Sequence, residues 1–457
     1  MENAQDQWVF LNWVVKQKFS YLLRHLPASA SDQRLARMDH MLRGTFIRVI
    51  GQGIDDMSWE LAKLPIQDDG FGMGDVSISG PAAFTANILE TKEAVLQAIP
   101  SAKSYFALLD LYPVPFHNAQ RAVASRPSPE VLIDFLYPYR QCIETICGIS
   151  EDNRVQAVES IYAQSAGANG NPHKVQKVIT DILTQSEVAD FHAFYRDNMT
   201  ASHNARLLSC HGPTAGAWLN CVPKDRHSMM SNEEFHLACC LRLGLRIPEA
   251  SGYCALCRTH TDFLGIHAFS CSHQRAFLLE KHDMFCKELR LLAVLAGVNA
   301  TDRHLTVFQQ LDPENMLRPD ISMPGMGQGG SRLLIDTAFT DTRNASNAPT
   351  AAIGHKEALK KIIDYKKRKY ERNCHRLGFS FLAAAVEILG AMSDDLIKLV
   401  KASVVRAAAR SAIPESTLSP YWYKRLSMVV QRGNARFWQA ASVRMTGAGA
   451  LQDESLE

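Results

Sequence analysis

The stretch "RPDISMPGMGQGGSRLLIDTAF" (318–339) decides the fold of the C-terminal part of the chain. It contains two short apolar segments, typical of strands, with a Gly-rich turn between them. Each segment carries one aspartate, Asp320 or Asp336. An unpaired carboxylate in a buried strand is costly, and two neighbouring carboxylates raise each other's pKa. A divalent cation removes both penalties, and Mg²⁺ prefers hard oxygen ligands. We therefore predict that Asp320 and Asp336 lie on adjacent strand ends and bind Mg²⁺ for phosphodiester hydrolysis.

The segments around this stretch complete an alternating pattern of helices and strands. Apolar periodicity and turn residues predict the order α-β-β-β-α-β, followed by two more helices. The predicted elements are a helix over 273–297, strands over 303–311, 318–323 and 331–339, a helix over 351–373 and a strand over 379–389. The C-terminal part is therefore predicted to be an α/β domain.

A lysine near the second aspartate would help to position the attacking water or to stabilise the charged phosphate. The strand itself offers only Ala338 two residues after Asp336, so the lysine must come from the following helix. That helix is rich in lysine: Lys356, Lys360, Lys361, Lys366, Lys367 and Lys369. Lys366 lies one helical turn before Tyr370, so their side chains share a face. We predict that Lys366 or Lys369 assists catalysis and that Tyr370 positions the substrate or packs beside the site. The alternatives are a solvated basic helix face and a nuclear-localisation signal at "KKRK" (366–369).

A cysteine and histidine cluster precedes the α/β pattern, in "YCALCRTHTDFLGIHAFSCSH" (253–273). Cys254 and Cys257 are spaced as two ligands in one tight turn, and His267 and Cys271 follow as H-x3-C on one face of a helical turn. This Cys3His set suits tetrahedral zinc, and four protein ligands make a closed, structural site. Substitute ligands are His260 and His273, and the alternative to zinc is a chance pairing.

The rest of the chain indicates a protein of two or three domains. Its 457 residues exceed what one core normally serves, and the net charge of +2 does not indicate any partner. Residues 7–150 and 151–245 have helical patterns, broken by Gly and Pro over 205–223. The N-terminus does not resemble a signal peptide, and no apolar run is long enough to span a membrane. Most of the 11 cysteines are expected to be free thiols or metal ligands, in a nuclear or cytoplasmic protein.

In combination, these motifs resemble a known family. The α-β-β-β-α-β order with "RPD" and a second aspartate is similar to the PD-(D/E)XK restriction-like nucleases. The series "CALC…HAFSC", "RPD", "LLID" and "KKRKY" resembles the C-terminal part of non-LTR retrotransposon reverse transcriptases that carry a restriction-like endonuclease. The segment "LPIQDDGFGMGDVSISGPAAFTAN" (64–87) looks like their thumb region, and 205–245 is similar to their linker.

This resemblance implies a domain organisation. It predicts a thumb-like helical remnant at 1–150, a helical linker at 151–245, a CCHC zinc knuckle at 250–275 and the endonuclease domain at 276–446. It also implies a DNA endonuclease with structural Zn²⁺ and catalytic Mg²⁺.

Two features depart from the family pattern. Ala338 occupies the third acid-motif position, and no Y-x-D-D polymerase strand is present. We therefore expect a fragment that begins near the thumb and cannot copy nucleic acid. The expected partner is DNA, with RNA as a second candidate, and no membrane. The alternative function is non-catalytic nucleic-acid binding by a decayed transposon remnant. Oligomeric state is not indicated by the sequence.

Overall fold

The computed structural model describes residues 3–29, 31–98, 129–150, 154–166, 175–247, 252–254, 256–271, 273, 275–302 and 306–453. The chain forms two compact units. Unit 1 contains Met1–Val9, Val49–Phe71 and Tyr195–Glu457, and unit 2 contains Phe10–Arg48 and Gly72–Phe194. The predicted segments 1–150 and 151–245 are therefore each divided between the two units.

Unit 2 is helical in its described residues. Its elements are the π-helix η1 (Leu11–Val15) and the α-helices α2 (Lys16–Leu23), α3 (Gln33–Ile50), α5 (Val76–Ala98), α8 (Pro129–Ser150), α9 (Arg154–Ser165) and α10 (Val175–Asn198), of which α3 and α10 end in unit 1. Its core is formed by apolar side chains of α5, α8, α9 and α10, including Ile88, Ile143, Ile161 and Ile179. Burial of these side chains stabilises helices whose sequence alone gives only modest helical propensity.

Unit 1 begins with short helices that lie in the segment 205–223 or pack near it. These elements are α1 (Ala4–Phe10), α4 (Asp56–Lys63), α11 (Ala201–Ser209), the 3-10 helix η3 (Ala217–Asn220) and α12 (Asn232–Leu243). The buried indole of Trp8 donates a hydrogen bond of 2.7 Å to the carbonyl of Leu219. None of the helices in the described part of the chain is both long and apolar enough to cross a membrane.

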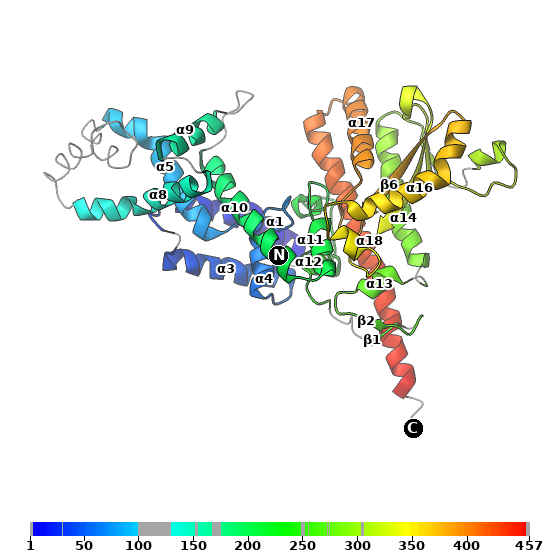
Figure 1. Cartoon of the computed structure of the whole chain (residues 1–457), viewed down its shortest axis with the longest axis horizontal. Helices are drawn as coiled ribbons and strands as arrows, with labels where there is room; N and C mark the ends of the chain where they lie inside the picture. The colour runs from blue at the N-terminus through cyan, green and yellow to red at the C-terminus, as the bar shows by residue number, and fades with distance from the viewer. Residues whose placement is uncertain are drawn as a thin grey trace. The chain divides into compact units, whose positions relative to one another are not determined.

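The remainder of unit 1 contains an α/β domain, so the chain combines a mainly helical region with an α/β region (Figure 1). Its elements are α14 (Arg275–Leu295), β3 (Thr301–Asp302), the 3-10 helix η5 (Val307–Gln310), β4 (Ile321–Met323), the 3-10 helix η6 (Gln328–Gly330), β5 (Leu333–Thr340), α15 (Ala348–Ala351), α16 (Glu357–Arg376), β6 (Ser380–Glu387), α17 (Asp394–Arg410) and α18 (Glu415–Asp453). The strands form one mixed sheet in the order β3-β4-β5-β6. Strand β4 pairs antiparallel with both β3 and β5, whereas β6 runs parallel to β5.

Both faces of β5 are covered, and the alternation of its side chains decides which helix each residue meets. Leu333 and Ile335 join the core that α14, α17 and α18 make on one face. Leu334 joins a second cluster with Tyr370 of α16 on the other face. Because side chains alternate along a strand, Asp336 shares the α16 face with Leu334.

The order of helices and strands agrees with the prediction, but one predicted strand is wrong. Residues 306–311 of the predicted strand 303–311 contain η5, and 303–305 lie outside the described residues. Phe308 of η5 is fully buried beside Tyr370, so its apolar character reflects packing against α16 rather than strand pairing. The first strand of the sheet is instead β3, which pairs with β4.

Candidate functional site

The pairing of β4 with β5 brings Asp320 and Asp336 to neighbouring positions. Ile321 of β4 pairs with Ile335 of β5, and the N–H of Asp320 donates to the carbonyl of Ile335 at 2.8 Å. Asp320 Oδ2 in turn accepts a hydrogen bond of 2.6 Å from the N–H of Thr337, the residue after Asp336. The register of this hairpin therefore fixes the backbone of one aspartate beside the other.

Asp336 is buried against α16, where it meets a lysine. The Lys366 ammonium forms an ion pair with Asp336 Oδ2, and the two side chains are only 18% and 5% exposed. One turn further along α16, the buried Tyr370 donates a hydrogen bond of 3.2 Å to the carbonyl of Arg318. Its ring stacks on Phe381 at 5.1 Å between centroids. Tyr370 thus ties α16 to the segment that carries Asp320.

The charges of these groups are balanced against burial. Burial raises the pKa of Asp336, and the neighbouring Asp320 carboxylate raises this pKa further. Lys366 and the Tyr370 hydroxyl act in the opposite direction and lower the pKa of Asp336. Burial and the nearby Asp336 raise the pKa of Tyr370, so its hydroxyl stays protonated and can donate a hydrogen bond. The site therefore has the electrostatic features of a cation-binding pair of carboxylates.

The other lysines of α16 and its N-terminal cap lie in different surroundings. Lys356 pairs with Asp394 at 2.7 Å, and Lys360 pairs with Glu357 at 2.6 Å. Lys369 is exposed, and its ammonium lies 4.8 Å from the centroid of the adjacent Tyr370 ring. Among the lysines described on this helix, Lys366 is the one that forms an ion pair with either aspartate.

Two residues at this site were not predicted from the sequence, and both come from α14. His282 Nε2 lies 2.9 Å from Asp320 Oδ2, and Cys286 Sγ lies 3.4 Å from Thr337 Oγ1. Burial alone would lower the pKa of His282, but the hydrogen bond with Asp320 and the nearby Cys286 together raise it to about 11. The missed signal is the H-x3-C spacing of His282 and Cys286, which repeats the spacing of His267 and Cys271 in the cysteine cluster.

A cleft of about 720 Å³ opens beside Asp320. Its walls include His282 and Cys286 of α14, and its basic residues are Lys287, Arg290 and Arg318. The Arg290 guanidinium is paired with Asp302, which also lines the cleft. Acidic side chains, Glu280, Asp283, Asp302 and Asp320, line the cleft as well, so Lys287 and Arg318 place positive charge beside carboxylates rather than making the whole cleft basic.

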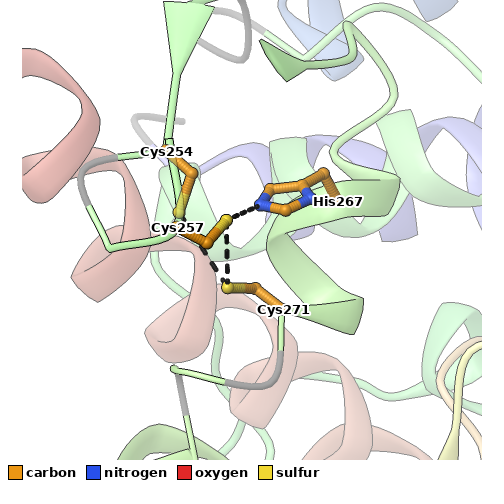
Figure 2. A group of neighbouring side chains, drawn as sticks. All are labelled: Cys254, Cys257, His267 and Cys271. Carbon is orange, nitrogen blue, oxygen red and sulfur yellow. Dashed lines mark hydrogen bonds between the residues drawn. The ribbon is translucent and has the colours of Figure 1, made fainter. Parts of the chain in front are cut away.

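The four predicted zinc ligands converge, as Figure 2 shows. The Cys257 Sγ lies 3.2 Å from His267 Nε2 and 3.8 Å from Cys271 Sγ, and Cys254 Sγ lies 3.9 Å from Cys271 Sγ. None of the three cysteines forms a disulfide. In a tetrahedral zinc site with Zn–S bonds of about 2.3 Å, the sulfur atoms lie about 3.8 Å apart. The arrangement therefore fits one zinc ion bound by Cys254, Cys257, His267 and Cys271.

Local structure holds this cluster in place. Strands β1 (Gly252–Tyr253) and β2 (His260–Thr261) form a small antiparallel hairpin around Cys254 and Cys257. Helix α13 (Ile266–Ser270) carries His267. The Asp262 carboxylate accepts hydrogen bonds from the N–H groups of Leu264, Ile266 and His267, which fixes the N-terminal end of this helix. Gly265 adopts φ 68°, a left-handed conformation that favours glycine.

The thiols differ in how readily they ionise. The hydrogen bond with Thr259 lowers the pKa of Cys257 to about 6. Burial raises the pKa of Cys271 to about 11. A bound cation favours the thiolate form of each cysteine ligand, because its positive charge offsets the cost of a buried negative charge.

The cluster is packed against the C-terminal helix. Phe269 of α13 stacks on Phe437 of α18, with centroids 5.2 Å apart. Arg343, which follows β5, donates to the carbonyl of Leu264 at 3.0 Å and pairs with the buried Asp341.

Comparisons with protein-family models and with curated proteins find no match for this chain. Its function is therefore inferred from the geometry of its own residues.

Proposed function

We propose that the site at β4, β5 and α16 hydrolyses phosphodiester bonds in DNA with the help of a divalent cation. The domain would then be a PD-(D/E)XK restriction-like endonuclease, derived from the C-terminal part of a non-LTR retrotransposon reverse transcriptase. The observation that carries the proposal is the ion pair between Lys366 and Asp336 beside Asp320. These residues are separated by up to 46 positions in sequence, and their meeting supports the carboxylate–carboxylate–lysine set that such hydrolysis needs.

The carboxylates of Asp320 and Asp336 are the candidate ligands for the cation, which our sequence-based prediction takes to be Mg²⁺. The fit is supported by the raised pKa of Asp336, because a cation between the carboxylates would relieve both their burial and their repulsion. When bound, the cation would supply activation of water and stabilisation of charge on the phosphate.

The chain's own groups have distinct tasks in this proposal. The Lys366 ammonium holds Asp336 and would donate to a charged phosphate oxygen. Tyr370 is a positioning residue, since its hydroxyl and stacked ring fix α16 against the Arg318 segment. The Arg318 and Lys287 side chains in the cleft would contact the nucleic-acid backbone.

A second candidate function is nucleic-acid binding without catalysis. It is favoured by the Lys366–Asp336 pair itself, which neutralises the buried carboxylate in the absence of any cation. In that case the zinc cluster and the exposed basic residues of α16, Arg368 and Lys369, would provide the binding surface. The two functions differ in one observable property, which is cation-dependent cleavage.

The test is a nicking assay with the purified full chain and supercoiled plasmid, with Mg²⁺, with Mn²⁺ or with a chelator. We expect nicking only with a cation, and a loss of about 10²-fold or more in Asp336→Asn, because several kcal/mol of charge stabilisation depend on that ligand. The matched control is Asp394→Asn, which removes an exposed carboxylate of the same domain. Binding of DNA without any cleavage would reject the enzyme in favour of the binding function.

A further inference from the structure

A second group of potential metal ligands meets at Asp320. Within the described residues, His282, Cys286 and Asp320 each offer one ligand atom, and these atoms all lie within 4.8 Å of one another. His282 and Cys286 are one turn apart on α14, so a single helix face presents an imidazole and a thiol to the same point. Asp336, whose carboxylate is paired with Lys366, is not a member of this group.

The spacing of these atoms suits a shared ion. His282 Nε2 lies 2.9 Å from Asp320 Oδ2 and 3.9 Å from Cys286 Sγ. With zinc–ligand bonds of about 2.0–2.3 Å, nitrogen and oxygen ligands lie about 3.0–3.4 Å apart, and nitrogen and sulfur ligands about 3.5 Å apart. A small movement of the Cys286 thiol would therefore complete a three-ligand set.

The surroundings hold two of the three ligands in place. The Thr337 N–H donates to Asp320 Oδ2 at 2.6 Å, and the Thr337 hydroxyl lies 3.4 Å from Cys286 Sγ. Thr337 thus contacts both the carboxylate and the thiol from β5. Such neighbouring hydrogen bonds orient the ligands of metal sites.

We propose that Asp320, His282 and Cys286 bind a divalent transition-metal ion of the zinc class, and that this ion, rather than Mg²⁺, occupies the Asp320 side of the site. Nitrogen and sulfur ligands favour Zn²⁺ and Co²⁺, whereas Mg²⁺ requires oxygen. All three residues line the 720 Å³ cleft, which leaves a remaining coordination position facing the substrate space. Three protein ligands with one open position are typical of catalytic zinc sites, in contrast to the closed four-ligand cluster at Cys254.

The role of this ion in cleavage rests on the proposed function, but its binding does not. The binding test uses Co²⁺ with the full chain after one equivalent of Zn²⁺ per chain has been added to fill the four-ligand Cys254 cluster, from which Co²⁺ displaces Zn²⁺ poorly. We expect one Co²⁺ per chain and an absorption band from a cobalt–thiolate bond. Cys286→Ser should abolish the band, and His282→Gln should weaken Co²⁺ binding by about 10-fold to 100-fold or more.

Matched controls are available in the same domain. Cys374→Ser replaces another buried cysteine, 1% exposed against 6% for Cys286, and His375→Ala replaces an exposed histidine of α16. Neither should change the band, and Asp336→Asn should leave Co²⁺ stoichiometry at one. If Cys286→Ser does not fold, as judged by circular dichroism, His282→Gln carries the test alone, because His282 lies at the cleft wall.

Two results overturn the proposal. The first is the absence of Co²⁺ binding beyond the Zn²⁺ cluster, and the second is Co²⁺ affinity that His282→Gln leaves unchanged, which would make His282 only a hydrogen-bond partner of Asp320. The nicking assay separates this failure from failure of the proposed function. Co²⁺ binding through Cys286 without nicking rejects the nuclease and keeps the site, whereas Mg²⁺-dependent nicking that His282→Gln does not affect keeps the nuclease and rejects the site.

Discussion

The Lys366–Asp336 ion pair permits a prediction on stability and on cleavage. The variant Lys366→Met removes the ammonium and keeps most of the aliphatic stem. Loss of one partner from a buried ion pair typically costs about 3–5 kcal/mol, because the other charge remains buried. The Lys366 side chain is 18% exposed and Asp336 is 5% exposed, so water can partly replace the ammonium. We therefore expect a loss of about 3 kcal/mol, the lower end of that range.

A double-mutant cycle isolates this pair from other effects. Asp336→Asn removes the charge that Lys366→Met leaves unpaired, so the double variant should be more stable than the sum of the two single losses predicts. The expected coupling is about 1–3 kcal/mol, measured by urea denaturation at neutral pH. A coupling below about 0.5 kcal/mol would show that the two groups do not depend on each other, and the reasoning from their contact would be wrong.

The same variant should separate catalysis from binding. Lys366→Met is expected to reduce nicking by about 10²–10³-fold, as for removal of one donor to a developing charge, while DNA affinity changes little. The comparison is Lys367→Ala, which should weaken DNA binding. It should also reduce the slope of the logarithm of the DNA-binding constant against the logarithm of salt concentration by about 0.9, the value for one phosphate contact. Nicking by Lys366→Met at the parent rate would leave α16 with a binding role only.

Two further predictions concern the zinc cluster and a buried glutamate. Cys257→Ser should reduce zinc content by one ion per chain, measured by elemental analysis, and should loosen residues 252–271, measured by faster hydrogen exchange, because the cluster has little core of its own. Burial raises the pKa of Glu387 from 4.5 to about 7, so this carboxyl lowers the stability progressively as the pH rises from about 4.5 to 7, and by a constant amount above that, but costs little at low pH. Glu387→Gln should therefore stabilise the protein by about 3 kcal/mol at pH 8 and by about 1 kcal/mol or less at pH 5, and an equal gain at both pH values would contradict this account.

The hairpin and the convergence of Cys254, Cys257, His267 and Cys271 could be predicted because their signals are local. The strands around Asp320 and Asp336 are bounded by a Gly-rich turn, and antiparallel pairing across such a turn places both aspartates side by side. The helical spacing of Lys366 to an aromatic ring made it one of the two candidate lysines, since a buried ring turns its face of the helix inward. Tyr370 is 2% exposed, and that burial is what brings Lys366 to the sheet.

The strand predicted over 303–311 was wrong for a related reason. An apolar residue in a short polar segment indicates burial but not the backbone conformation that achieves it. Phe308 lies in the 3-10 helix η5, and its side chain is buried because it packs against Tyr370 and Leu334 on the α16 face of the sheet. Nothing within the segment itself specifies that packing.

The two H-x3-C pairs show where local sequence stops being informative. His267 and Cys271 follow Cys254 and Cys257 within one short segment, so their spacing alone indicates a Cys3His set, with His260 and His273 as substitute ligands. His282 and Cys286 have the same spacing, but their partner Asp320 lies 34 residues beyond Cys286 and reaches them only when α14 packs on β4 and β5. In an isolated helix the pair is indistinguishable from two residues of an amphipathic face. A site formed by the packing of separate helices and strands can also stay open on one side. Its ligands come from rigid elements around a cleft, rather than from a loop that closes on the ion.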